Sequence, residues 1–316
     1  MIVRRKITAA HVTDIHRQPS LTAMKVAMLV VAVLIFATMQ PGIAHDGPES
    51  VIESLNATML KTGPTADLLF RRATEFRAMR DDLQAAADLQ RAIHLDGSLE
   101  IARLELARLQ LTLEKAAAAS GEAGSAAGEP LETLDPLISS QDESIKIAAL
   151  ALRGEIHLSY CQWAAAVADF TSALAKRPDE IEWVLWLATA QQENGQQAAS
   201  LIGLRKSFDT TQSPVVRAVL CDTLIETARL NSETHSVLSA SLLREAEEII
   251  DDELRDSRLK SAWLIRRALV LLLNNKPDAA KQDLDSALAE LNIRLATHRP
   301  DPVLVKDRER VQLLLK

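Results

Sequence analysis

Only a few side chains in this 316-residue sequence have the types and spacing that chemistry requires. His157 and Cys161 are four residues apart, so on a helix they share a face, as metal ligands often do. Two ligands do not close a zinc site, and we expect His157 to pack in the core instead. The doublet His45-Asp46 is of the kind that binds metal in helical hydrolases, but the sequence places no further His and Asp beside it. We therefore expect no metal site.

Motifs for nucleotide binding and catalysis are missing from the sequence. It contains no phosphate-cradling glycine loop, no His-Glu-x-x-His and no nucleophile elbow. The chain has ten glycines, and most of them fall in turns or in low-complexity sequence. These observations predict no catalytic residues and no cofactor, and a metal-dependent hydrolase is the most remote of the functions considered.

The composition points to helices. Apolar residues make up 47% and charged residues 25% of the chain, which is typical of a folded protein. Aromatic residues make up only 3%, and the apolar residues are mostly the helix formers Ala and Leu, so the sequence predicts an all-α fold. The net charge is −7, and residues 1–44 are basic, so the rest of the chain is more acidic still. An acidic body repels phosphate groups, and we expect no nucleic-acid partner.

The N-terminus has the pattern of an export signal. Residues 27–39 are a continuous apolar run behind Lys25, and Gly42 and Ala44 supply the small residues that a signal peptidase reads. We expect residues 1–44 to be a signal peptide, cleaved after Ala44, in a periplasmic or secreted protein. Met24 is the expected true start. The run is too short to span a bilayer comfortably, so we expect no stable membrane insertion after cleavage. An uncleaved N-terminal anchor is the alternative.

The chain repeats itself from about residue 64. Small and large residues recur at intervals of 3, 9, 4 and 3 residues in three places, and in the first two a further residue, Gly97 or Pro178, follows by 5. The three sets are Ala73, Phe76, Ala85, Leu89 and Ala92; Gly154, His157, Ala166, Phe170, Ala173 and Pro178; and Ala268, Leu271, Ala280, Leu284 and Ala287. Small residues allow two antiparallel helices to approach closely, and large ones fill the space beside them.

This pattern resembles the tetratricopeptide repeat, which has a 34-residue period and two helices per repeat. The resemblance implies a right-handed superhelical solenoid. We expect the solenoid to cover residues 64–316, after an N-terminal segment at 45–63, with a flexible Ala/Gly/Ser insertion at 116–128. The expected helix pairs lie near 66–96, 98–140, 147–177, 181–209, 214–255 and 259–297, and a closing helix lies at 302–315. That helix is expected to cap the last repeat, and occlusion of the solenoid's own groove is the alternative.

The resemblance also implies a concave groove that is lined by the first helix of each repeat and holds a peptide. The family's groove positions fall on Phe70, Thr74, Arg77, Leu104, Arg108, Leu111, Ala151, Glu155, Leu158, Leu185, Thr189, Gln192, Ile265, Leu269 and Leu272. These residues predict a mixed, mainly apolar groove with few charges.

The remaining cysteines and tryptophans fit packing better than chemistry. Cys161 and Cys221 fall on first helices of repeats three and five, too far apart for a disulfide, and we expect two buried free thiols. We expect Trp183, Trp186 and Trp263 to pack between repeats, with stacking on a ligand as the alternative. The sequence thus predicts a non-catalytic scaffold or adaptor that binds a protein or peptide outside the cytoplasm. The alternative is a structural subunit of a cell-envelope complex that uses its convex face and loops.

Overall fold

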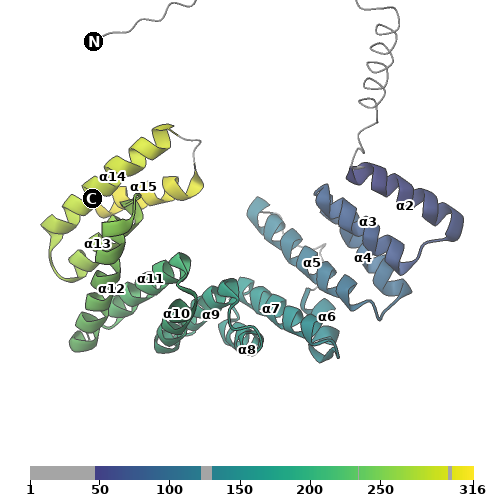
Figure 1. Ribbon diagram of the computed structural model, residues 1–316, viewed down its shortest axis with the longest axis horizontal. Helices are drawn as coiled ribbons and strands as arrows, with labels where there is room; N and C mark the ends of the chain where they lie inside the picture. Colours follow the sequence, from purple (N-terminus) through teal and green to yellow (C-terminus); the bar gives the residue numbers. More distant parts are fainter. Residues whose placement is uncertain (1–46, 122–129, 234, 298–300) are drawn as a thin grey trace, which may run out of the picture.

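The computed structural model describes residues 47–121, 130–233, 235–297 and 301–316. Every regular element in these residues is a helix, and the helices follow one another along an open arc from α2 to α15 (Figure 1). Each helix contacts only its near neighbours in the chain, which is the contact pattern of a solenoid. The predicted all-α solenoid is confirmed.

The six predicted helix pairs are present, and their numbering from one to six is kept below. They are α3 (Ala66–Ala78) with α4 (Asp82–Leu95); α5 (Glu100–Ser120) with α6 (Pro130–Leu134) and the 3₁₀ helix η1 (Asp135–Ser139); α7 (Glu143–Ser159) with α8 (Trp163–Leu174); α9 (Ile181–Glu193) with α10 (Gln197–Thr211); α11 (Pro214–Leu230) with α12 (Ser236–Asp256); and α13 (Ser261–Leu273) with α14 (Pro277–Thr297). The predicted boundaries agree with these bounds to within a few residues.

The helices begin where short polar side chains can cap them. The Thr65 hydroxyl accepts a hydrogen bond from the backbone N–H of Leu68, and the Asp142 carboxylate accepts one from Ser144 and one from Ile145. Ser213 caps α11 in the same way, and Pro214 follows it at the first helical position. Each such cap stabilises a helix by about 1 kcal/mol because it satisfies an N–H that has no partner inside the helix.

The turns between the two helices of a repeat share one backbone feature. The residue seven positions after the small residue of the first helix is left-handed in repeats one, three, four and six. These residues are Arg80 (φ 62°), Cys161 (φ 56°), Gly195 (φ 73°) and Asn275 (φ 56°). Only repeat four has a glycine there, so the other three turns place a side chain in a conformation that glycine adopts without strain.

The core is a series of small clusters between neighbouring helices rather than one central mass. Alanines of the repeated sets, such as Ala85, Ala166 and Ala280, are completely buried. In repeat three the ring of Phe170 lies against Gly154 so closely that a Cβ on Gly154 would be 2.9 Å from the ring. Phe170 also contacts Trp186 with 5.7 Å between ring centroids, which joins repeats three and four.

Two helical segments were not predicted from the repeat pattern. Residues 48–62, left as an N-terminal segment, form helix α2 (Pro48–Thr62), which packs on α3. Residues 116–120, predicted to belong to the flexible insertion, continue α5 to Ser120, where Gly121 ends it with a left-handed conformation. Alanine is the strongest helix former, which explains why the helix runs on through this segment. Residues 122–129 are outside the described part.

The last helix, α15 (Pro302–Leu314), packs on α14. Leu304 and Val311 join a cluster with Ala287 and Leu291, and this covers the open end of repeat six. The structure therefore supports the capping role predicted for this helix. Val303 and Leu313 remain 63% and 71% exposed because they lie on the other faces of the helix.

Candidate binding surfaces

The predicted groove residues lie on α3, α5, α7, α9 and α13, the first helices of their repeats. Successive first helices contact one another from α5 through α13, so their side chains form neighbouring rows. Thr74, Arg77, Arg108, Thr189 and Leu272 are exposed, and Phe70, Glu155, Leu158, Leu185, Gln192 and Leu269 are half-buried. Eleven of the fifteen side chains therefore reach solvent.

The other four predicted groove residues are in the core. Leu104 and Leu111 pack against α6, η1 and α7, Ala151 packs against α8, and Ile265 packs in the C-terminal cluster with α14 and α15. The prediction that these four line a groove is wrong. Leu104 and Leu111 are covered by α6, η1 and α7 and Ile265 by α14 and α15, while the short side chain of Ala151 lies against the second helix of its own repeat.

Charged and polar side chains connect the first helices to each other. Arg77 on α3 pairs with Glu105 on α5, which also pairs with Arg108. The Lys115 ammonium lies 2.7 Å from the Glu155 carboxylate on α7. Each of these exposed pairs adds at most about 1 kcal/mol, because water screens them. They nevertheless make this part of the face more charged than predicted. The prediction considered only the groove residues themselves and left out the charged residues that pair with them.

The same kind of bridge continues toward the C-terminus. The Gln192 amide on α9 donates to the Thr223 hydroxyl on α11 at 3.1 Å. Arg266 on α13 makes two hydrogen bonds to Asp222 on α11 at 2.8 and 2.7 Å, and its guanidinium also stacks on Trp263 at 4.7 Å from the ring centroid. These contacts hold the spacing between first helices, which is the spacing along which any extended ligand would lie.

Sequence reasoning missed a second repeated feature, an ion pair inside the repeat. In repeats one, three and six an arginine on the first helix makes a bidentate contact with an aspartate sixteen residues later on the second helix. The pairs are Arg72–Asp88, Arg153–Asp169 and Arg267–Asp283, with N···O distances between 2.6 and 2.9 Å. All three aspartates are buried, and the hydrogen bonds to them raise the pKa of each arginine.

The signal for this pair was present in the sequence. Each arginine directly precedes the small residue of the repeated set, and each aspartate directly precedes the large residue that packs against it. Charged residues on helices are usually exposed to solvent, so the sequence alone does not indicate that these residues form a buried pair. The pair is recognised only once the burial of the aspartates is known.

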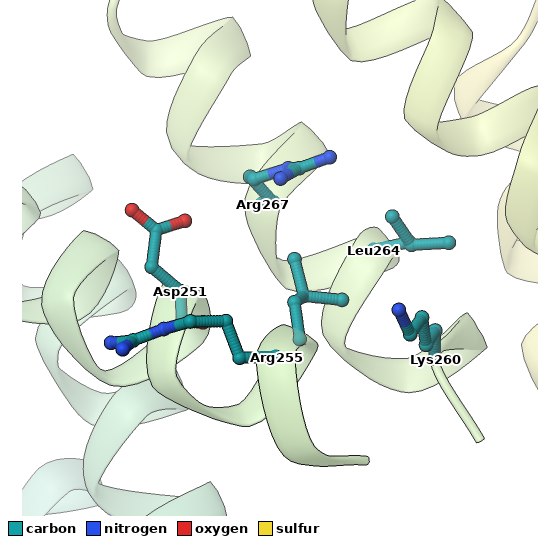
Figure 2. Close-up of a pocket in the computed structure, with 6 residues that line it drawn as sticks. Asp251, Arg255, Lys260, Leu264 and Arg267 are labelled. Atoms are coloured by element: carbon teal, nitrogen blue, oxygen red, sulfur yellow. The ribbon is translucent and has the colours of Figure 1, made fainter. Parts of the chain in front are cut away.

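An open cleft of about 620 Å³ lies between α12 and α13 (Figure 2). Asp251 and Arg255 come from α12, and Lys260 and Leu264 lie across from them. The guanidinium groups of the two arginines that line this cleft already form ion pairs within the protein. Arg267 pairs with Asp283, and Arg255 pairs with Asp252 on its own helix. The cleft therefore offers mainly the Lys260 ammonium to an anion, which is too little for a specific site.

The cysteines and His157 differ from expectation in one respect. Both cysteines are free thiols, but only Cys221 is buried, where desolvation raises its pKa to about 12. The prediction that Cys161 is buried on a helix is wrong, because it lies exposed in the left-handed turn after α7. His157 is largely covered, with Nδ1 2.5 Å from the Gln162 side-chain oxygen and Nε2 3.6 Å from Asp169. Within the described residues, no cluster of three metal-binding side chains forms.

The tryptophans pack between repeats, as predicted. Trp183 and Trp186 lie against residues of α8, and Trp263 is 8% exposed in the cluster that joins repeats four to six. Residues 1–44, predicted to be a signal peptide, and the His45-Asp46 doublet fall outside the described part of the chain. Among the helices that the structure describes, none is long and apolar enough to cross a membrane.

Comparison with known proteins gives a match in structure only. No protein-family model matches the sequence, and no curated protein resembles it. The C-terminal part of a TPR repeat-containing protein from Cytophaga hutchinsonii superposes with a TM-score of 0.58 at 10% identity, over 83% of this chain and 95% of that one. A tetratricopeptide repeat protein from Parabacteroides merdae gives a TM-score of 0.49 at 15% identity, over 92% and 99% of the two chains. The described part of the chain therefore has the fold of the tetratricopeptide-repeat proteins.

Proposed function

We propose that this protein is a non-catalytic scaffold that binds a protein or peptide partner along the face formed by its first helices. The observation that carries the proposal is the row of solvent-accessible side chains on the first helices α3, α5, α7, α9 and α13, whose spacing is held by contacts between neighbouring first helices, α11 included. An extended chain can contact such a row one repeat at a time.

The chemistry of the face suggests the kind of segment it binds. Half-buried apolar residues such as Phe70, Leu158 and Leu185 alternate with hydroxyl and amide groups and with paired charges. Such a surface suits a segment that has spaced apolar side chains and a backbone free to hydrogen-bond, rather than a highly charged one.

The test uses substitutions that alter the face without touching the core. Thr74 and Thr189 are exposed on first helices, and each hydroxyl donates to the carbonyl four residues earlier. The variant Thr74→Glu/Thr189→Glu adds two carboxylates to the proposed face. Ser172 and Ser286 have the same exposure and the same type of hydrogen bond on the second helices α8 and α14, so Ser172→Glu/Ser286→Glu is a matched control.

We expect wild type and the Ser172/Ser286 control to retain the same partner in affinity capture from an extract, and the Thr74/Thr189 variant to lose it. Circular dichroism should show that all three proteins are folded. Equal retention by all three proteins would move the interface to the convex face or the loops, the alternative of a structural subunit.

We further propose that the protein acts outside the cytoplasm after cleavage behind Ala44. This rests on the apolar run at 27–39 and the small residues Gly42 and Ala44. Mass spectrometry of the protein from its native cells should find His45 at the N-terminus. Recovery of peptides from residues 27–39 in the mature protein would indicate an anchor instead.

A further inference from the structure

Repeat four lacks the ion pair of repeats one, three and six, and a cleft takes its place. A shift of 34 residues carries Arg153 to Leu187 and Asp169 to Gly203. Both of these residues line a cleft of about 380 Å³ formed by α8, α9 and α10, three helices that follow one another along the arc in Figure 1. A Cβ on Gly203 would meet nothing within 4 Å, so the missing aspartate side chain leaves open space.

The walls of this cleft are mainly apolar. Leu174 and Pro178 from the end of repeat three line it together with Val184, Leu187 and Leu204 of repeat four. The charged residues that line it, Asp179 and Lys206, have opposite signs and are both exposed. A ligand of this cleft therefore has an apolar body and no net charge.

One hydroxyl that lines the cleft has no hydrogen-bond partner among the residues that the structure describes. A shift of 34 residues carries the fully buried Ala173 to Ser207, and Ser207 is 8% exposed. Its Oγ makes no hydrogen bond within the described part of the chain. The other serine of the repeat, Ser200, is satisfied, because its Oγ donates to the Ala188 carbonyl. A buried hydroxyl without a partner is unfavourable by about 1–3 kcal/mol, so a hydrogen bond from a bound molecule to Ser207 would relieve this cost.

We propose that this cleft of repeat four binds a small, neutral and mainly apolar organic molecule with a single hydroxyl group, which hydrogen-bonds to Ser207. The volume holds about a dozen water-sized atoms, which limits the ligand to that size. The cleft is formed by α8, α9 and α10 around the positions of the ion pair, so this site is distinct from the proposed partner-binding face and does not depend on it.

The test compares two probes that differ by one oxygen, 4-propylphenol and propylbenzene. Titration of the purified protein, followed by the NMR methyl signals of leucine and valine, should give saturable binding of 4-propylphenol with a Kd below about 1 mM. Ser207→Ala should weaken the binding of 4-propylphenol about tenfold and change that of propylbenzene less than about twofold, because only the phenol uses the hydroxyl.

Two variants close the cleft by different means. Leu187→Arg/Gly203→Asp rebuilds the ion pair of the other repeats, and Gly203→Leu fills the space without a charge. Both should lower the affinity for 4-propylphenol at least about tenfold. Ile202→Arg alters the exposed neighbour of Gly203, which does not line the cleft, and should bind as wild type does.

The proposal is overturned if wild type does not saturate with 4-propylphenol up to its solubility limit. It is also overturned if a folded cleft-closing variant binds as tightly as wild type, or if Ser207→Ala weakens both probes equally.

Discussion

Repeats three and four are related by a shift of 34 residues, but different side chains lie between their two helices. Repeat three joins its helices by the Arg153–Asp169 pair and by the ring of Phe170 against Gly154. Repeat four has Leu187, Gly203 and Leu204 at three of these positions and an open cleft between them. Alanines and glycines allow the two helices of a repeat to approach closely, and this sets the fold. The residues at the ion-pair positions beside them can differ from one repeat to the next. A repeat can therefore gain a binding site at these positions.

The largest effect is expected from the large residue of repeat three. Phe170 is completely buried and contacts both Gly154 and Trp186, so Phe170→Ala should lower the free energy of unfolding by about 3–5 kcal/mol. Leu204→Ala should lower it by about 2–3 kcal/mol, because it removes a smaller side chain beside a cleft that is already open. Urea unfolding followed by circular dichroism measures both, and a larger loss at Leu204 would contradict the comparison.

Substitution by alanine at one equivalent position should change the free energy of unfolding in opposite directions in the two repeats. Asp169→Ala should lower the free energy of unfolding by about 2 kcal/mol, because the half-buried Arg153 loses two charge-assisted hydrogen bonds. Gly203→Ala, at the equivalent position of α10, should raise it by about 0.5–1 kcal/mol, because a helix-interior glycine is replaced where there is space.

Thermal unfolding of the two single variants and of wild type decides that prediction. A loss at Gly203→Ala would show that the space beside this glycine is not available, and it would remove the basis for the cleft as well.

A smaller effect is expected in the turns that follow the first helices. Cys161 and Gly195 are equivalent and both left-handed, with φ of 56° and 73°. Cys161→Gly should stabilise repeat three by about 0.5–1 kcal/mol, and Gly195→Ala should destabilise repeat four by about 1 kcal/mol. Hydrogen exchange of the amides in α7 to α10 would localise the two changes, and the same sign for both would be inconsistent with equivalent turns.

The fold could be predicted closely from the sequence because its determinants are local and repeated. The small residues Ala73, Gly154 and Ala268, with their large partners, locate three repeats, and the 34-residue period locates most of the others. Helix α2 has no counterpart in the period and was missed, although Pro48 near its start and Gly63 after its end are ordinary helix signals.

The binding surfaces were less predictable because they depend on contacts between repeats. Leu104 and Leu111 occupy groove positions by analogy but are covered by η1 and α7, neither of which a single-repeat pattern describes. The cleft of repeat four lies where Leu187 and Gly203 replace the arginine and aspartate of the ion pair. This replacement can be recognised only after the ion pairs of the other repeats are known. Spacing predicts which residues approach one another, but the space left between them depends on side chains from three helices.

Binding by the first helices is tested by the affinity of the captured partner for three forms of the protein. These forms are wild type, Thr74→Glu/Thr189→Glu and Ser172→Glu/Ser286→Glu, compared by calorimetry after each is shown to be folded. If the first helices form the binding face, the Thr74/Thr189 variant should bind at least about tenfold more weakly, a loss of about 1.4 kcal/mol, and the Ser172/Ser286 variant should match wild type. Equal affinity of the Thr74/Thr189 variant and wild type, with a loss only at Ser172/Ser286, would contradict the account and place the interface on the second helices.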